Sequence, residues 1–263
     1  MTDTTNNLES TSVYQMPRGA YETFIIVAAF GFLLLSGFTF AYGRYGERFS
    51  GGLDAACAEA AFQAGRKFEQ RGNNAGALVR YRQAMEGRFK KESQRLMCGR
   101  AIGDLLHKQH RYSEAIAEYE KLPAEAFNEP GAYTGYVTSL WREGRLTEAR
   151  EKGRVWLELA NWAKDEDQQI WARHALMRIA EEDGRHQDAL THGEAMLAIR
   201  PAGDAHMHLV RVLRAMNRHQ EARGHAAAYL ESGDDPKLRE EAQSLLPLLD
   251  KVIAALDEED APT

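Results

Sequence analysis

Histidine is the residue type whose placement most invites a chemical explanation, because seven of the nine histidines lie in the second half of the chain. These seven are His174, His186, His192, His206, His208, His219 and His225. Neutral imidazoles bind zinc and transfer protons near neutral pH. His206 and His208, however, are two residues apart and would point away from each other on a helix. His186 recurs 33 residues later as His219, and His192 recurs in the same way as His225. Repetition explains this pattern, so we expect no metal site and no cofactor.

Signatures of catalysis are missing from the sequence. It contains no G-x-S-x-G, no H-E-x-x-H, no phosphate-binding loop and no G-x-G-x-x-G. The two cysteines, Cys57 and Cys98, form no C-x-x-C pair, which argues against a zinc ribbon or a thioredoxin-type site. A single bridge between them and two separate buried thiols both fit the sequence. We therefore expect a protein that is not an enzyme.

The composition is that of a helical protein with an acidic balance. Charged residues make up 27% and hydrophobic residues 44% of the chain, with only seven prolines. Strong helix formers dominate, and β-branched residues are sparse after residue 50. The net charge of −6 argues against general nucleic-acid binding, which needs a basic face.

Residues 24–42 form an apolar run of nineteen residues without a charge. As a helix this run would span roughly 28 Å, close to the ~30 Å hydrocarbon core of a bilayer. Tyr21 and Tyr42 lie at its ends, where aromatic rings favour the headgroup level. A signal peptide would have a basic start and a shorter run, and a core helix would have a polar face. We predict a transmembrane helix at 21–42.

The segments beside the span differ in composition. Residues 1–20 are polar and predict a disordered tail, and residues 43–52 contain four glycines and predict a flexible linker. Residues 258–263 predict an acidic tail. One arginine lies close before the span and two lie close after it, a difference that favours a cytoplasmic C-terminal domain only slightly, so the side stays open.

A six-residue pattern recurs through the rest of the chain. Its clearest copy is Gly144-Arg145-Leu146-Thr147-Glu148-Ala149, and other copies lie at 184–189, 217–222, 110–115 and, more loosely, 72–77. Each copy predicts a turn, a helix start and a small residue one turn into the helix. The small residues are Ala77, Ala115, Ala149, Ala189 and Ala222, at spacings of 38, 34, 40 and 33. A period near 34 is typical of repeats that contain two helices.

With this period and these turns, residues 54–232 resemble the tetratricopeptide-repeat family. The family prefers glycine twelve residues before the repeat alanine; Gly65 and Gly103 match, and Val137, Met177 and Val210 do not. It prefers an aromatic residue four after; Tyr81 and Tyr119 match, and Gly153, Gly193 and Ala226 do not. Of the prolines expected twelve residues after, only Pro201 is present. The resemblance implies an all-α fold, in which stacked helix pairs form an α-solenoid.

The predicted solenoid domain covers residues 53–257. Its five helix pairs are predicted at 54–71 with 74–87, 92–109 with 112–122, 130–143 with 146–161, 166–182 with 186–199, and 203–216 with 219–231. The longer spacings predict insertions around 88–92 and 161–169. A final helix at 236–257 has one apolar face and predicts a cap on the last pair, and Pro247 predicts a kink or a break within it.

In the family that the chain resembles, the first helix of each pair lines a concave surface. Projection onto that surface gives the candidate partner-binding residues Arg66, Arg100, Asp104, Trp141, Trp171, Arg178, Arg211 and Arg214. Arginine and tryptophan are enriched at binding hot spots, so a partner with carboxylates or an extended peptide fits. The alternative is that these are ordinary solvated helix positions. The Lys/Asn/Arg set of the family's carboxylate clamps is not found.

These observations favour a scaffold or assembly factor that holds a membrane-associated protein or peptide in its groove. The resemblance extends to membrane-anchored bacterial proteins, so we expect a single-pass protein of the cytoplasmic (inner) membrane. One alternative is a structural protein that forms homo-oligomers at the membrane. A second alternative is a metal-binding sensor or enzyme that uses the late histidines.

Overall fold

The computed structural model describes residues 54–201 and 203–259. The chain divides into two compact units, Met1–Ala56 and Cys57–Thr263, and of the first unit only the helical residues 54–56 are described. The predicted tail at 1–20, the membrane helix at 21–42 and the linker at 43–52 lie outside the described residues. Within the described part of the chain, no helix is both long and apolar enough to cross a membrane.

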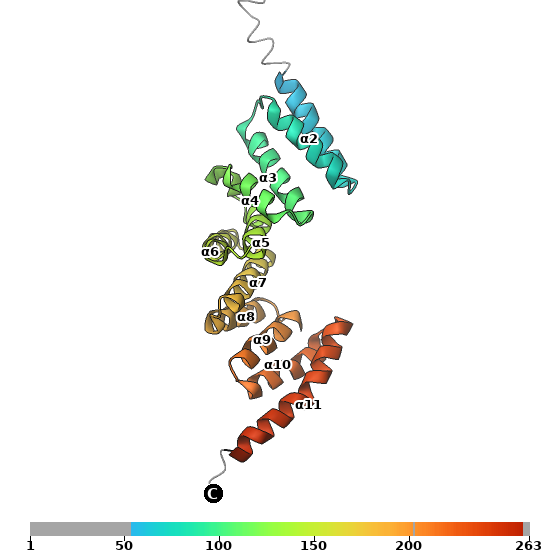
Figure 1. Cartoon of the computed structure of the whole chain (residues 1–263). Helices are drawn as coiled ribbons and strands as arrows, with labels where there is room; N and C mark the ends of the chain where they lie inside the picture. The colour runs from blue at the N-terminus through green and yellow to red at the C-terminus, as the bar shows by residue number, and fades with distance from the viewer. Residues whose placement is uncertain (1–53, 202, 260–263) are drawn as a thin grey trace, which may run out of the picture. The chain divides into compact units, whose positions relative to one another are not determined.

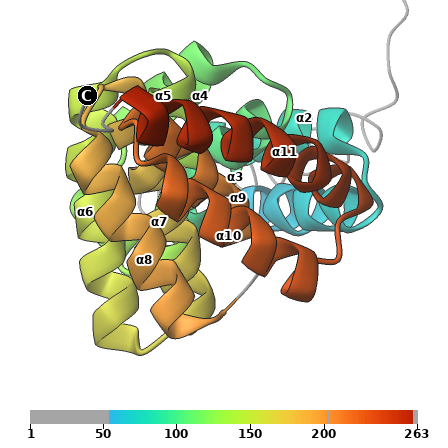
Figure 2. The same ribbon diagram turned by 90° about the horizontal axis from the view of Figure 1, so that it is seen from below.

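The second unit is built from helices, as predicted for a solenoid, and they follow one another in antiparallel pairs (Figures 1 and 2). After the helical residues 57–70, the α-helices are α2 (Asn74–Glu86), α3 (Glu92–Lys108), α4 (Tyr112–Glu120), α5 (Thr134–Arg142), α6 (Leu146–Ala163), α7 (Glu166–Glu182), α8 (His186–Ile199), α9 (Gly203–Ala215), α10 (His219–Ser232) and α11 (Pro236–Glu259). Each helix from α2 to α11 packs on the next one in sequence. In addition, α3 packs on α5, and α5 packs on α7. We call the helix at 57–70, α3, α5, α7 and α9 first helices, and α2, α4, α6, α8 and α10 second helices.

The recurring turn has one backbone geometry in all five copies. The residue five before each repeat alanine has a positive φ; these residues are Gly72, His110, Gly144, Gly184 and Asn217. The following N–H returns to a carbonyl in the last turn of the first helix, for example from Arg145 to Leu140 at 2.9 Å. This bond caps the helix end, and only glycine adopts the required φ without a steric cost.

In four of the five copies, the arginine and the acid of the pattern form an ion pair across the first turn of the second helix. These pairs are Arg111–Glu114, Arg145–Glu148, Arg185–Asp188 and Arg218–Glu221. The alanine that follows is fully buried in every copy. The pattern therefore encodes a chain reversal, a surface ion pair and a close helix contact.

In the first two pairs, a small residue on the first helix faces a large one on the second. A Cβ added at Gly65 would lie 2.6 Å from the ring of Tyr81, and one added at Gly103 would lie 2.6 Å from the ring of Tyr119. The glycines therefore make room for the aromatic rings, because a side chain in their place would overlap with the ring.

The order of sizes is reversed in the later pairs. Here the glycine lies on the second helix, and large side chains from first helices fill the space above it. A Cβ at Gly153 would lie 2.9 Å from Leu176 and 3.7 Å from Val137. A Cβ at Gly193 would lie 2.5 Å from Leu209 and 3.2 Å from the Met177 sulfur. In these pairs the first helix lacks the glycine of the family pattern and the second helix lacks its aromatic residue, and the two changes compensate for each other.

Other features differ from the sequence prediction. Two 3-10 helices, η1 (Ala124–Phe127) and η2 (Pro130–Tyr133), fill the connection after α4, so the α-helix predicted from residue 130 begins only at Thr134. The extra residues predicted at 161–169 lengthen α6 to Ala163, and a left-handed Lys164 ends it. The helix α11 runs unbroken through Pro247 and ends two residues beyond the predicted residue 257. Cys98 is buried and Cys57 is exposed, and both are free thiols, so the two are not bridged.

Candidate partner-binding face

Successive first helices are joined by polar or cation–π contacts along one face, which we call the first-helix face. The contacts are Lys108–Glu69 at 3.1 Å, His107–Ser139 at 3.0 Å, Arg178–Trp141 at 5.6 Å to the ring centroid, His174–His208 at 3.1 Å and Arg211–Glu241, which reaches α11, at 3.4 Å. Candidate residues from different pairs therefore belong to one continuous series of neighbours.

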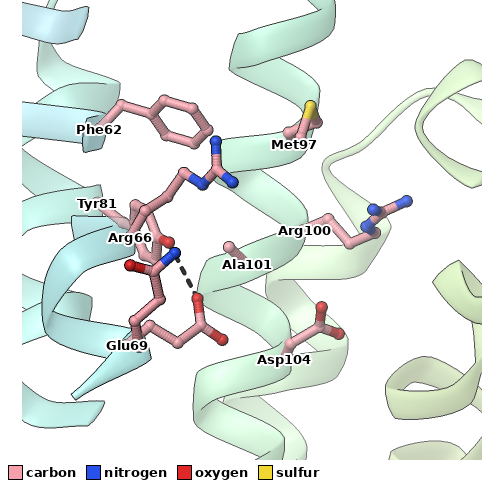
Figure 3. A pocket seen from close by; sticks show the side chains of 9 residues that line it. Phe62, Arg66, Glu69, Tyr81, Met97, Arg100, Ala101 and Asp104 are labelled. Carbon is pink, nitrogen blue, oxygen red and sulfur yellow. Dashed lines mark hydrogen bonds between the residues drawn. The ribbon is translucent and has the colours of Figure 1, made fainter. Parts of the chain in front are cut away.

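The face is hollowed between the helix at 57–70 and α3, over a volume of about 320 Å³ (Figure 3). This N-terminal hollow is lined by Phe62, Arg66, Glu69, Gln70, Tyr81, Met97, Arg100, Ala101 and Asp104. Three of the predicted site residues, Arg66, Arg100 and Asp104, meet here. Phe62 and Tyr81 are buried, whereas 46% of Met97 is exposed, which leaves an apolar surface beside the charged groups.

Tyrosines of the second helices hold the carboxylates of this hollow. The Tyr81 hydroxyl donates to Glu69 at 3.0 Å, and the Tyr119 hydroxyl donates to Asp104 at 2.5 Å. Burial raises the pKa of the Asp104 carboxyl, although the hydrogen bond from Tyr119 opposes this shift. The two carboxylates are therefore held by tyrosine hydroxyls of the second helices, and the glycines of the first helices leave the room that these tyrosine rings need.

The two arginines of the hollow have weaker internal partners. Among residues 54–201 and 203–259, Arg66 makes no ion pair. Arg100 lies 3.7 Å from Glu129, whose side chain is 78% exposed, and 3.3 Å from the Ala126 carbonyl. In Figure 3 the Arg66 side chain extends towards α3, and Arg100 extends to the other side of α3. Both guanidinium groups can bind carboxylates of a partner.

A second hollow of about 360 Å³ lies between α7 and α9, beside the end of α8. This C-terminal hollow is lined by Ile170, Trp171, His174, Met196, Arg200, Asp204, Ala205 and His208. Trp171 is 58% exposed, so a large aromatic surface faces solvent. Burial lowers the pKa of both histidines, that of His208 to about 3, and the neighbouring His174 adds to the shift of His208. The pair is therefore neutral at pH 7 and shares one hydrogen bond.

The remaining predicted residues lie on the same face but outside these hollows. Trp141 is half-buried under the Arg178 and Arg142 guanidinium groups, at 5.6 and 4.4 Å from its ring. Arg211 pairs with Glu241, and Arg214 is exposed. The eight candidates are thus divided between two hollows and the surface that joins them.

Four of the seven late histidines form two neighbouring pairs. His206 faces His225 of α10 at 2.8 Å, whereas His208 faces His174 of α7. Their opposite directions are those expected for residues two apart. Within the described ranges, no three His, Cys, Asp or Glu side chains are arranged to hold a metal ion.

A hollow on the second helices is among those that were not predicted from the sequence. It lies between the second helices α6 and α8 and is lined by Arg150, Arg154, Leu176, Ala180, Arg185, Asp188, Thr191 and His192. The signal was the i, i+4 pair Arg150 and Arg154, which lies on one side of a helix, next to the arginine of a recurring turn.

Comparisons with known proteins agree with this architecture. No protein-family model matches the chain, and no curated protein sequence matches it. Among solved structures, it is similar to YrrB, described as a TPR protein with an unusual peptide-binding site, at 17% identity and a TM-score of 0.57, over 70% of this chain and 90% of YrrB. It is also similar to the MamA protein, at 17% identity and a TM-score of 0.57, over 66% of this chain and 91% of MamA.

A third similar structure is that of pilF from Pseudomonas aeruginosa, at 17% identity and a TM-score of 0.54, over 77% of this chain and 93% of pilF. At this level of identity, what is shared is the fold. Together with the period of the repeat, the buried alanines and the recurring turn, this similarity shows that the described part of the chain has the fold of a tetratricopeptide-repeat solenoid.

Proposed function

We propose that the protein is a membrane-anchored scaffold or assembly factor that binds another protein or a peptide on its first-helix face. The N-terminal hollow is the observation that carries this proposal. It combines two arginines with spare hydrogen-bond donors, two carboxylates held in place by tyrosines and the exposed thioether of Met97. Groups of this kind recognise a partner by charge and shape, and binding rather than catalysis is the role they support.

The apolar run at 24–42 supports the membrane part of the proposal. An anchor confines the first-helix face to the vicinity of the bilayer, which raises its effective concentration for membrane-bound partners. Fractionation of the full-length chain tests the anchor: we expect it in the membrane fraction, released by detergent. Recovery in the soluble fraction without detergent would refute it.

Site-specific crosslinking in intact cells tests the binding face. We would place a photoreactive amino acid at Met97 or at Trp171, one position in each hollow, and identify adducts by mass spectrometry. The matched control is Val79, which is 65% exposed but lies on the second helix α2. We expect a discrete protein adduct from Met97 or Trp171 and none from Val79. The same adducts from all three positions, or none from either hollow, would contradict the proposal.

Self-association is a second candidate, supported by an exposed apolar stripe on α11. Leu248, Val252 and Leu256 are 55%, 40% and 44% exposed and lie four residues apart on one side of the helix. Light scattering of the full chain in detergent tests this candidate. We expect an oligomer that Val252→Glu dissociates, and a monomeric wild-type protein would exclude self-association through this stripe.

A further inference from the structure

The unpredicted hollow on the second helices has a donor set unlike that of the first-helix face. It has a volume of about 210 Å³, and α6 and α8 form its walls beside Leu176 and Ala180 of α7. Three arginines, Arg150, Arg154 and Arg185, line it together with a single carboxylate, Asp188. A concentration of guanidinium groups around so small a space is a characteristic of anion sites.

Two carboxylates neutralise part of this charge. Asp183 bonds Arg150 at 3.1 Å and Arg185 at 2.7 Å, and Asp188 bonds Arg185. Arg154 is exposed, and it makes no ion pair with any residue that the structure describes. One complete guanidinium group, together with the free nitrogens of Arg150, is therefore left for a ligand.

Two residues that line the hollow, and one residue whose charge acts on His192, each have a buried nitrogen atom without a hydrogen-bond partner within the described chain. These atoms are Arg185 Nη2, His192 Nδ1 and Arg173 Nε. Arg173 lies on α7 three residues before Leu176, and it makes no ion pair with a described residue. A buried donor without a partner is costly, so such atoms point to a group that is bound from outside.

The electrostatics of the surrounding groups favour an anion. Burial lowers the pKa of the Arg173 guanidinium, and burial followed by the charge of Arg173 lowers the pKa of the His192 imidazole. Arg150, Arg154, Arg173 and Arg185 contribute four positive charges, and Asp183 and Asp188 contribute two negative charges, which leaves a formal charge of +2. A dianion would balance this charge.

We propose that this hollow binds a phosphate group, with Arg150 and Arg154 as the principal ligands and His192 as an additional hydrogen-bond donor. A phosphate monoester carries close to two negative charges at pH 7 and offers three acceptor oxygens, which suits several guanidinium groups better than a single carboxylate does. The site lies on the second helices and is independent of partner binding on the first-helix face.

The test is a calorimetric titration of the full-length chain in phosphate-free buffer. Inorganic phosphate and a phosphoserine peptide are the two probes, and acetate at the same ionic strength is the comparison. We expect saturable binding of at least one phosphate probe, weakened roughly ten-fold or more by Arg154→Gln. This variant keeps its fold, because Arg154 is exposed and makes no ion pair within the described chain. Arg82→Gln, at an exposed arginine of the second helix α2, is the matched control and should bind as the wild type does.

The two probes separate the possible sources of the phosphate. Tighter binding of the peptide indicates a phosphorylated protein, and equal binding indicates free phosphate, so either result supports the site. Equal binding by wild type and Arg154→Gln, or competition by acetate as strong as by phosphate, would overturn it. Crosslinking from Met97 should be unchanged in Arg154→Gln, which keeps this test distinct from that of the proposed function.

Discussion

The first two helix pairs and the later pairs solve the same packing problem with opposite residues. In the first two, glycine lies on the first helix and tyrosine on the second: Gly65 faces Tyr81, and Gly103 faces Tyr119. In the third and fourth pairs, Gly153 and Gly193 lie on the second helix, and the large residues lie on first helices. The fifth pair follows the later arrangement in milder form, with Val210 and Ala226 both buried.

This difference teaches that the close approach of the helices depends on complementary sizes rather than on a particular residue at a particular position. It also has a chemical consequence. Tyrosine places a hydroxyl under the first-helix face, where it bonds Glu69 or Asp104. The glycines that replace tyrosine in the third and fourth pairs supply no hydroxyl, and His174 and His208 satisfy each other instead.

Gly103→Ala should have the largest effect on stability. The new Cβ would lie 2.6 Å from a Tyr119 ring that is buried and tied to Asp104, so neither side can move without loss. We expect a decrease of about 1–3 kcal/mol in the free energy of unfolding, measured by urea denaturation. Gly193→Ala should cost less, because its Cβ approaches the flexible side chains of Leu209 and Met177 rather than a rigid ring.

Gly224→Ala in α10 is the matched control for these variants. No heavy atom would lie within 4 Å of its Cβ, so we expect a gain of about 0.5–1 kcal/mol from helix propensity. In a double-mutant cycle, Tyr119→Leu should recover about 1 kcal/mol of the Gly103→Ala loss. A strictly additive double variant would show that the ring and the glycine are not coupled.

Acidification should change the stability of the fold in opposite directions through the ionisable groups of the two regions. His174 and His208 have pKa values lowered in the fold, that of His208 to about 3, so the unfolded chain binds protons first below an ordinary pKa of about 6.5. Their contribution to stability is therefore lost as the pH falls from 6.5 towards 3, by at most about 1.4 kcal/mol per pH unit for each histidine. Asp104 has a raised pKa, so its protonation favours the fold as the pH falls.

Urea midpoints between pH 7 and pH 4 measure this effect. The double variant His174→Gln with His208→Gln should flatten the pH dependence, whereas Asp104→Asn should steepen the loss on acidification because it removes the opposing group. An unchanged profile in the histidine variant would mean that the pair is not the source of the pH sensitivity.

The turns, in contrast, should respond alike in both regions. Gly72 and Gly184 have φ values of 74° and 70° and open space around them, so alanine at either position should cost about 1 kcal/mol through backbone strain alone. Replacement of Asn217, which has a φ of 59°, by glycine should raise the free energy of unfolding by a few tenths of a kcal/mol. Thermal denaturation of the three variants provides the comparison. Unequal losses at Gly72 and Gly184 would show that the two regions differ in more than packing.

Removal of the turn ion pairs should have the smallest effect. Arg111→Gln in the first region and Arg218→Gln in the later region each break a bidentate contact on the surface. Exposed pairs contribute little, so we expect small and equal shifts of the thermal midpoint. The hydrogen bonds lower the pKa of Glu114 and Glu221. Any loss of stability on removal of the arginine should therefore be present at pH 7 and vanish as the pH falls through the lowered pKa values of these carboxylates.

The helix pairs could be predicted from the sequence because the recurring turn marks the boundary between the first and second helix in each of five copies. The pattern that contains Ala149 located both the turn and the buried alanine. It did not predict η1 and η2, because a proline-containing connection gives no helical period to follow. Nor did it predict the reversed pairs: Met177 and Gly193 each depart from the family pattern, and only their contact shows that the two departures compensate.

The candidate site was predicted in part for a related reason. Helical projection placed Arg66, Arg100 and Asp104 on one face, and they share one hollow. Projection treats each helix alone, however, so it did not show that Tyr119 reaches through to Asp104 or that Arg150 meets Asp183 from the next pair. Those contacts depend on how neighbouring helices are spaced.

The glycines of the later second helices also limit how this chain can gain or lose repeats by recombination. Gly153 is covered partly by Leu176 and Gly193 by Leu209, residues that belong to the following pair. An exchange with breakpoints between a second helix and the next first helix would separate each glycine from its leucine. It would join a tyrosine-bearing helix to a neighbour that leaves it no room, or a glycine to one that leaves a void. Breakpoints in the turn between a first helix and its own second helix would separate Gly193 from Met177 in the same way, so we expect exchanges to preserve the packing only between pairs that share one arrangement of large and small residues.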